Sequence, residues 1–243
     1  MIFDHRTAVV TGAAGRIGQG TARKFAQYGV KLYLADIDME RLDAFAAELR
    51  STGADVHTVF MDVSDLTSIT TAAETILQDA ARVDILVNNA GVWPRATALE
   101  SSDDAWQKTI NLNLNSVFRL SKIFGQKMKE QNYGRIVNLG SIAGEAGLPE
   151  MCAYSVAKAG VIMLTKTMAM ELAKCGVTVN CVSPGAIERD GAKWAHMTYM
   201  GEDGHAGAPR DIAETVLFLA HQDYITGENI VVDGGRSLGP SHR

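Results

Sequence analysis

Short apolar runs alternate with longer amphipathic stretches along the whole chain, and this alternation limits the possible fold more than any other feature. Several runs are continuously apolar, which is typical of strands covered on both faces. They lie at residues 7–10, 31–35, 56–60, 85–87, 136–139, 177–182 and 229–232. The stretches between them predict helices at 17–28, 39–50, 66–81, 103–131, 153–175 and 210–220. Seven strands joined by helices predict a doubly wound α/β fold, with a seven-stranded parallel sheet and helices on both faces.

Chain length allows one large domain or two small ones. The chain has 243 residues, of which 47% are hydrophobic, so it can bury a sizeable core. It contains no internal repeat, low-complexity tract or linker-like stretch. We therefore expect residues 1–243 to form a single domain.

Charge and residue usage argue against several classes of protein. A net charge of −5 disfavours a nucleic-acid-binding surface, which is usually basic. No apolar stretch approaches the ~18 residues of a membrane span, and the first residues lack a signal-peptide pattern. Three cysteines without paired-motif spacing favour reduced thiols in a cytoplasmic protein. The six histidines are scattered and no paired-carboxylate cluster occurs, so we expect no metal site.

A glycine-rich loop follows the first apolar run. Residues 11–20 read TGAAGRIGQG, with Gly12, Gly15 and Gly18 at three-residue spacing. Glycines between a strand and a helix allow positive φ and close backbone approach. The helix N-terminus then presents free N–H groups and positive dipole to an anion. The loop predicts a phosphate or pyrophosphate site, and a tight turn without a ligand is the alternative.

Asp36 favours a dinucleotide as that ligand. It ends the second apolar run, where a carboxylate can accept hydrogen bonds from the adenosine ribose hydroxyls and repel a 2′-phosphate. It therefore favours NAD over NADP, unless it merely caps the following helix. Arg16, inside the loop, points the other way, because a guanidinium there can pair with a phosphate.

A tyrosine–lysine pair supplies the candidate chemistry. Tyr154 and Lys158 in YSVAK stand four residues apart on an expected helix, so both lie on one face. A tyrosine pKa near 10 is poorly matched to proton transfer at pH 7, and a neighbouring ammonium favours the phenolate. Tuned in this way, Tyr154 can exchange a proton with an alcohol or carbonyl. Tyrosine and lysine also decorate helices by chance at this spacing, so the pair alone is weak evidence.

Other polar residues strengthen this interpretation. Ser141 follows the run at 136–139 and is placed to hydrogen-bond a reacting oxygen. The NNAG of residues 88–91 ends another run. Asn113 stands inside an expected helix although asparagine is a mediocre helix former, and its amide can hold a water or bond a backbone carbonyl.

Together these motifs resemble those of the short, single-domain branch of the short-chain dehydrogenases/reductases. TGAAGRIG, Asp36, the MDV of residues 61–63, NNAG, NLNSVF, Ser141 before YSVAK, VNCVSPGAI and YITGENIVVDGG occur in the family's order across nearly the whole chain. The resemblance implies a Rossmann-type dinucleotide-binding and catalytic domain. It also implies an oxidoreductase that transfers a hydride at nicotinamide C4, and a homotetramer assembled through the two long helices.

The resemblance also implies roles for individual residues. Ser141 would polarise the substrate carbonyl, and Tyr154 would be the general acid–base. Lys158 would bind the nicotinamide ribose and lower the pKa of Tyr154, while Asn113 would hold a water in a proton relay. Cofactor contacts are implied for Gly12, Gly15, Arg16, Ile17, Gly18, Asp36, Asp62, Val63, Asn89, Ala90, Gly91, Tyr154, Lys158, Pro184, Gly185 and Ile187.

Two departures from the family pattern bear on the cofactor. The usual loop is TGxxxGxG, but Arg16 replaces its middle glycine, as in the pteridine reductases, and this keeps NADP open. Arg189 stands where many relatives carry threonine.

The substrate is less defined than the reaction. Residues 188–209 correspond to the family's substrate lid and carry aromatic, Met and His side chains. Ser141, Tyr154, Trp93 and Arg95 are the candidate substrate contacts, and a cleft with Arg95 and Glu145 would suit a polyol or hydroxy acid. An equally good interpretation of Arg95 and Glu145 is that both are surface charges without a role in substrate binding. Resemblance to 3-oxoacyl-carrier-protein reductases, which typically use NADPH, gives a second candidate function, and a non-enzymatic dinucleotide sensor is a third.

Overall fold

A computed structural model of the chain describes residue 3, residues 5–188 and residues 205–239. Seven parallel strands form one sheet in the order β3-β2-β1-β4-β5-β6-β7. The strands are β1 (Thr7–Thr11), β2 (Lys31–Asp36), β3 (Val56–Phe60), β4 (Ile85–Asn88), β5 (Gly134–Leu139), β6 (Val177–Pro184) and β7 (Asn229–Val232). The predicted doubly wound α/β fold is confirmed, and every predicted strand is present.

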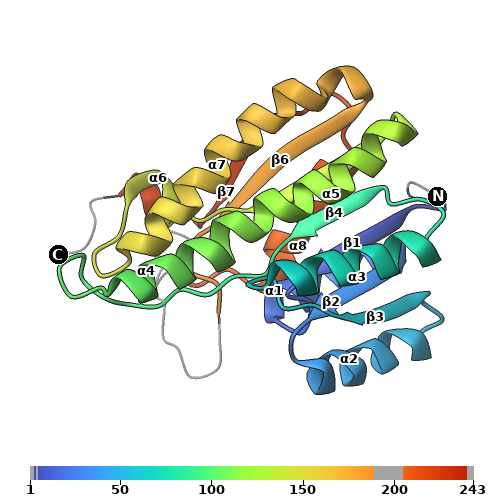
Figure 1. The fold of residues 1–243 in the computed structure, drawn as a ribbon, viewed down its shortest axis with the longest axis horizontal. Helices are drawn as coiled ribbons and strands as arrows, with labels where there is room; N and C mark the ends of the chain where they lie inside the picture. Colours follow the sequence, from blue (N-terminus) through green and yellow to red (C-terminus); the bar gives the residue numbers. More distant parts are fainter. Residues whose placement is uncertain (1–2, 4, 189–204, 240–243) are drawn as a thin grey trace.

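Helices cover both faces of the sheet (Figure 1). One layer contains α1 (Arg16–Gln27), α2 (Met39–Ser51) and α8 (Pro209–His221). The other contains α3 (Leu66–Asp79), α5 (Ser116–Gln131) and α7 (Cys152–Leu172).

The central strand β1 shows why the apolar runs are continuous. Ala8 and Val10 belong to the core on the α1 side, whereas Val9 belongs to the core on the α3 side. Successive side chains of a strand point to opposite faces, so a strand covered on both sides needs an apolar residue at every position.

The helix expected over residues 103–131 is divided into three parts. It consists of α4 (Asp103–Ile110), a π-helical turn, η1 (Asn111–Asn115), and α5. Three shorter elements were also not expected. They are α6 (Ile142–Ala146), a 3₁₀ turn, η4 (Arg236–Leu238), and a second 3₁₀ turn, η2 (Ala173–Cys175), which ends the helix expected at 153–175.

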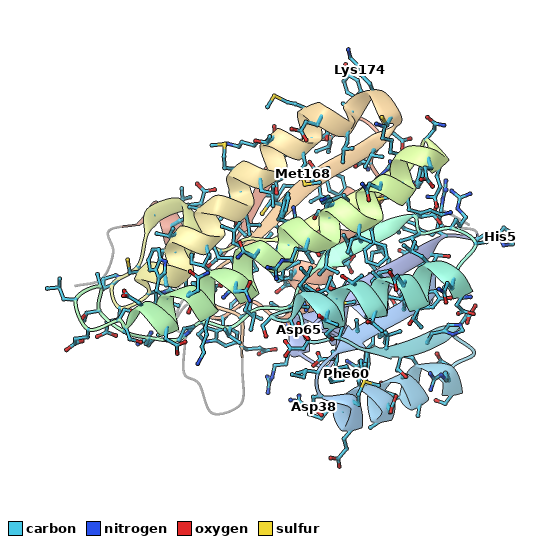
Figure 2. All side chains as sticks on the ribbon, viewed as in Figure 1. His5, Asp38, Phe60, Asp65, Met168 and Lys174 are labelled. Carbon is cyan, nitrogen blue, oxygen red and sulfur yellow. The ribbon has the colours of Figure 1, made fainter. Side chains whose placement is uncertain are left out.

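The carboxyl ends of the strands meet at one edge of the sheet, and α4, α6 and the start of α7 extend beyond that edge (Figure 1). Asp38 and Asp65, which cap α2 and α3, lie on this side in Figure 2, whereas His5 and Lys174 lie at the opposite edge. The order of the strands reverses between β1 and β4. In open α/β sheets ligands bind at such a switch point, outside the carboxyl ends of the strands.

A buried polar network ties the strands at this switch point to the helices above them. Asn88 of β4 donates to Asn138 of β5 at 2.8 Å and to Ser121 of α5 at 2.9 Å. Asn138 in turn donates to the Thr165 hydroxyl of α7 at 2.9 Å. Because buried polar groups are costly without partners, this network fixes one register of β4, β5, α5 and α7.

Candidate active site

The glycine loop packs tightly against the end of β4. Gly12 has φ +63°, and a Cβ there would lie 2.8 Å from Ala90 Cα. A Cβ on Gly18 would overlap the Gly12 carbonyl oxygen. Asn89 closes the contact, since its side-chain amide donates to the carbonyls of Thr11 and Gly12, both at 2.9 Å. Two of the three glycines therefore allow this close packing of the loop.

The first turn of α1 offers its donors to an anion. Gly15 is the N-cap, and it has no side chain that could accept a hydrogen bond from this end of the helix. The first turn contains no acidic residue and begins with Arg16 and Ile17. By contrast, a serine or aspartate side chain caps α2, α3, α4 and α6. The start of α1 therefore fits the pyrophosphate of a dinucleotide.

Asp36 holds the glycine loop and keeps acceptor capacity. It ends β2, and its Oδ2 accepts from the Ala14 N–H at 2.9 Å while Oδ1 accepts from the Asp38 N–H at 3.1 Å. A carboxylate has about four lone-pair sites, so Asp36 can accept further hydrogen bonds, for example from ribose hydroxyls.

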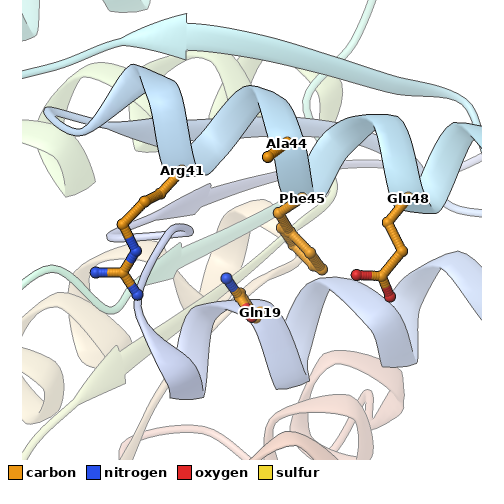
Figure 3. Close-up of a pocket in the computed structure, with 5 residues that line it drawn as sticks. All are labelled: Gln19, Arg41, Ala44, Phe45 and Glu48. Atoms are coloured by element: carbon orange, nitrogen blue, oxygen red, sulfur yellow. The ribbon is translucent and has the colours of Figure 1, made fainter.

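The Ala14 carbonyl is bound by side chains of two helices, whereas the Ala14 N–H is bound by Asp36. It accepts from Gln19 of α1 at 3.2 Å and from Arg41 of α2 at 3.3 Å. Figure 3 shows these two side chains at the loop end of a groove between α1 and α2, which Ala44, Phe45 and Glu48 also line. The Ala14 peptide is therefore fixed by β2, α1 and α2 together.

Arg16 reaches across the carboxyl edge of the sheet. Its guanidinium donates to the Glu188 carbonyl at 3.3 Å and so links the start of α1 to the segment after β6. In that segment Ile187 bridges to Gly207 and packs against the core, while Pro184 ends β6. A Cβ on Gly185 would meet Asp233 Cα at 2.7 Å.

Two further predicted residues lie after β3. Val63 is buried, and Asp62 accepts from the Ser64 N–H and hydroxyl at 2.8 and 2.7 Å. Asp62 therefore shapes the turn into α3.

Lys158 is buried at the centre of the candidate catalytic group. Its side chain is 3% exposed, and Nζ donates to the Leu139 carbonyl, at the end of β5, at 2.7 Å. A Cβ on Gly91 would lie 2.9 Å from Asn113 Oδ1 and 3.7 Å from Lys158 Nζ, so Gly91 allows the close approach of both residues. Burial lowers the pKa of Lys158 to about 8.

Asn113 owes its position to the π-helical turn. It is fully buried, its Oδ1 accepts from the Val92 N–H at 3.2 Å, and its amide donates to the Thr109 carbonyl at 3.0 Å. π-Helical turns are rare and occur frequently at functional sites. Here the turn lies between α4 and α5, and through Asn113 it contacts the loop after β4.

Ser141 and Tyr154 lie side by side. Ser141 is the N-cap of α6, and its hydroxyl accepts from the Ala143 N–H at 3.1 Å. It also lies close enough to the Tyr154 hydroxyl to lower the tyrosine's pKa. Lys158 Nζ stands 5.7 Å from the centre of the Tyr154 ring. Gly144 was not identified from the sequence. A Cβ at this position would lie 2.6 Å from the Lys158 carbonyl carbon, so the glycine allows α6 to pack against α7. The signal in the sequence was a glycine three residues after Ser141.

The expected lowering of the Tyr154 pKa by Lys158 is not found. Burial raises the pKa of Tyr154 above its ordinary value, and this effect is larger than the lowering by Ser141. Desolvation disfavours the phenolate and the ammonium alike, so burial shifts the pKa of each side chain toward its neutral form. The sequence shows the charge of the lysine but not the burial of the pair.

The candidate substrate residues lie at the outer side of this group. Trp93 and Arg95 are exposed in the loop after β4, where Ala96 bridges to Met151, next to the start of α7. Arg95 lies 3.6 Å from Glu150, whereas Glu145 accepts from the Asn229 amide, so these two candidate cleft residues have different partners.

Most of the predicted lid cannot be compared with the structure. Residues 189–204 lie outside the described residues, including Arg189, Trp194, His196, Met197, Tyr199 and Met200. Across residues 5–188 and 205–239, no group of three or more His, Cys, Asp or Glu side chains is arranged to hold a metal ion. In the same part of the chain no helix has the length and apolar character needed to span a bilayer.

The buried ammonium predicts a specific pH dependence of stability. Between pH 8 and 10.5 the unfolded chain keeps a proton on Lys158 that the folded chain has released, so this lysine makes stability rise with pH. Relative to Lys158→Met, the unfolding free energy of the wild type should rise by about 1.4 kcal/mol from pH 7 to pH 9. Denaturant titrations at equal protein concentration measure this difference.

The control is Lys166→Met, at an exposed position of the same helix, which should leave the pH dependence unchanged. Burial also raises the pKa of Cys181 to about 11, but that effect is present in wild type and variant and cancels in the comparison. A pH-independent difference between wild type and Lys158→Met would contradict the burial of a charge at this position.

Known proteins with similar sequences match nearly the whole chain. The sequence pattern of the short chain dehydrogenases matches residues 6–197. Identity is 36% over 243 residues to a 3-oxoacyl-[acyl-carrier-protein] reductase of Thermotoga maritima, covering 97% of this chain and 99% of that protein. It is 37% over 248 residues to a 7alpha-hydroxysteroid dehydrogenase of Bacteroides fragilis, covering 97% and 96%.

A solved structure extends the similarity to three dimensions. The crystal structure of a protein provisionally named gluconate dehydrogenase, from Agrobacterium tumefaciens, matches with a TM-score of 0.89 and 33% identity over 98% of both chains. Both the sequence and the fold therefore place the chain in the short-chain dehydrogenase/reductase family of oxidoreductases, which act on CH–OH or keto substrates.

Proposed function

We propose that the protein transfers a hydride between NAD and a secondary alcohol or ketone, with a small polar hydroxy compound as substrate. The observation that carries the proposal is that Ser141 and Tyr154 lie next to each other beside the buried Lys158. Two hydroxyls that meet at the carboxyl edge of the sheet can both reach one substrate oxygen. When bound, the nicotinamide accepts or donates the hydride at its C4.

Each catalytic residue has one task in this proposal. Ser141 donates a hydrogen bond to the substrate oxygen, and Tyr154 takes the proton of an alcohol or gives one to a carbonyl. Lys158 binds the ribose next to the nicotinamide through the N–H donors that Leu139 does not use. Asn113 has an acceptor and one donor engaged with backbone, and its remaining N–H holds the water of a proton relay.

The cofactor would lie along the carboxyl edge from β2 to β6. The start of α1, with Gly12, Gly15, Arg16, Ile17 and Gly18, would hold the pyrophosphate. Asp36 would bind the adenosine ribose. The remaining contacts proposed are Asp62, Val63, Asn89, Ala90, Gly91, Pro184, Gly185 and Ile187, and in this proposal Ile187 meets the carboxamide.

Loss of the tyrosine hydroxyl tests the catalytic assignment. A panel of polyols, hydroxy acids, steroids and aromatic alcohols with NAD, followed at the absorbance of the reduced nicotinamide, identifies a substrate. With that substrate Tyr154→Phe should lower kcat at least 100-fold, since general acid–base catalysis contributes about 10²–10⁴-fold. Tyr133→Phe, far from the carboxyl edge, serves as the control. Full turnover by Tyr154→Phe would refute the assignment.

Asp36 supports NAD as the preferred cofactor, because its carboxylate stands at the end of β2 and would repel a 2′-phosphate. In fluorescence titrations the wild type should bind NADH at least tenfold more tightly than NADPH. Asp36→Ala should weaken the binding of NADH and should reduce or reverse the preference for NADH over NADPH. A clear preference of the wild type for NADPH would overturn this part of the proposal.

Arg16 supports a second candidate, an NADPH-dependent reductase of 3-oxoacyl or pteridine-like substrates. Its guanidinium lies at the start of α1, where a further phosphate could be paired. The similarity to the Thermotoga maritima 3-oxoacyl-[acyl-carrier-protein] reductase points to the same candidate. The cofactor titration and the substrate panel, extended with 3-oxoacyl thioesters and pterins, separate the two functions.

We also propose a homotetramer assembled through α5 and α7. Val156, Met163 and Met170 recur every seven residues along α7 and are 47%, 60% and 75% exposed, and Phe118 of α5 is 50% exposed. Light scattering should give the mass of four 26.1 kDa chains. Met163→Glu should dissociate the assembly, whereas Asp43→Lys, at an exposed position of α2 on the other side of the sheet, should leave it intact. A monomeric wild type would refute the proposal. The cytoplasmic location stays a prediction from the sequence.

A further inference from the structure

The π-helical turn η1 carries more than Asn113. Its sequence, NLNLN, contains three asparagines, and Asn111 begins the turn while Asn115 ends it. Asparagine is a mediocre helix former, because its short amide competes for backbone hydrogen bonds. The amide of each of the three donates a hydrogen bond, so each side chain makes a contact that an apolar residue could not make.

The main chain of Asn111 marks the point where the helix changes its spacing. Its N–H donates to the carbonyls of Gln107 and Lys108 in α4, and its carbonyl accepts from the N–H of Ser116, the first residue of α5. The second bond spans five residues instead of four, which is the pattern of a π-helix. The orientation of the residues that follow therefore depends on where Asn111 is held.

The side chain of Asn111 ties the turn to another part of the fold. Its amide donates to the Ser64 carbonyl at 2.6 Å, and its Oδ1 accepts from the Asn115 amide at 3.3 Å. Ser64 lies between β3 and α3, 47 residues earlier in the sequence. The bond to Ser64 thus joins η1 to the turn after β3, whereas the bond to Asn115 stays within η1.

The turn that contains Ser64 has many hydrogen bonds of its own. The Ser64 N–H and hydroxyl donate to Asp62 Oδ1 at 2.8 and 2.7 Å. The Asp62 N–H donates to the Ser68 hydroxyl oxygen at 2.9 Å, and the Asp62 carbonyl accepts from the Asp65 N–H at 3.1 Å. The Ser64 carbonyl is therefore a well-fixed point against which the helix can be held.

Asn113 is packed with little clearance in the same π-helical turn. Its Oδ1 accepts from the Val92 N–H at 3.2 Å, and a Cβ on Gly91 would lie 2.9 Å from that oxygen. On the side of α7, a Cβ on Gly160 would lie 2.8 Å from Leu114 Cδ2. Because both neighbours come so close, a small rotation of η1 would move the Asn113 oxygen away from the Val92 N–H.

We propose that Asn111 is a positioning residue, which fixes η1 through the Ser64 carbonyl and so keeps the Asn113 side chain against the loop after β4. The inference rests on the proposed function for the task of Asn113, which is to hold a water of the proton relay. Asn111 also joins that relay to the turn of Asp62 and Val63, which the proposed function places at the cofactor.

Hydrogen exchange of the Val92 amide reports on Asn113, because this N–H donates to the Asn113 side chain. In the full-length protein without cofactor, Asn111→Leu should speed exchange at Val92 at least tenfold, since the bond that holds the turn at Ser64 is lost. Asn113→Ala removes the acceptor itself and sets the upper limit. Exchange at Val87, within β4, should stay within twofold of the wild type.

The matched control is Asn115→Leu, the same substitution in the same turn, which removes the bond to Asn111 Oδ1 but not the bond to Ser64. It should leave exchange at Val92 within threefold of the wild type. Asn111→Asp keeps an acceptor for Asn115 but has no N–H for the Ser64 carbonyl at neutral pH. It should behave like Asn111→Leu, and it takes the place of that variant if Asn111→Leu does not fold.

Three results of the exchange experiment would overturn the proposal. One is an equal effect of Asn115→Leu and Asn111→Leu on Val92. Another is exchange at the wild-type rate in both Asn111 variants. The third is an equal rise at Val92 and Val87, which would mean a general loss of stability instead of a displaced Asn113.

Kinetics separate this positioning role from the proposed function. With a substrate from the panel, Asn111→Leu should lower kcat at least tenfold and leave KM for that substrate within twofold, because the relay is displaced while the binding contacts remain. A wild-type kcat in Asn111→Leu would overturn the inference even where Tyr154→Phe confirms the chemistry. Full turnover by Tyr154→Phe would instead refute the proposed function, and the exchange measurement at Val92 does not depend on that result.

Discussion

The candidate site depends on a lysine ammonium placed inside the protein. Lys158 is almost fully buried, and its fixed partner is the carbonyl at the end of β5. Lowering its pKa from 10.5 to about 8 corresponds to roughly 3 kcal/mol of disfavoured charge at neutral pH. The packing of α7 against β6, α6 and α4 offsets this destabilisation. The ammonium N–H groups that Leu139 does not use are left to bind a ligand at the carboxyl edge of the sheet.

The rest of the edge is shaped around this lysine. Gly91 and Gly144 allow the loop after β4 and the short helix α6 to approach it, because side chains at either position would collide with Asn113 or with the Lys158 backbone. The π-helical turn brings Asn113 against the Gly91–Val92 backbone. Ser141 both caps α6 and pairs with Tyr154, so one hydroxyl links the local backbone to the candidate chemistry.

The sheet and most helices could be predicted from the sequence because strands covered on both faces leave an unmistakable apolar pattern. The break at Asn111–Asn115 could not, since a π-helical turn adds no distinctive residue type to an amphipathic stretch. The partners of side chains were also beyond the sequence: Arg95 lies next to Glu150, and Asn88 forms a core network with Asn138. The sign of the Tyr154 pKa shift was wrong because desolvation depends on packing that no motif spells out.

The central claim is that the carboxyl edge around Lys158 is where cofactor and substrate meet. A crystal structure of the protein with NADH tests it most directly. The account predicts the pyrophosphate at the first turn of α1, Asp36 on the adenosine ribose, and Lys158 Nζ within hydrogen-bond distance of the second ribose, with the Tyr154 hydroxyl facing the nicotinamide. A dinucleotide bound elsewhere, or a Tyr154 hydroxyl directed away from an occupied site, would contradict it.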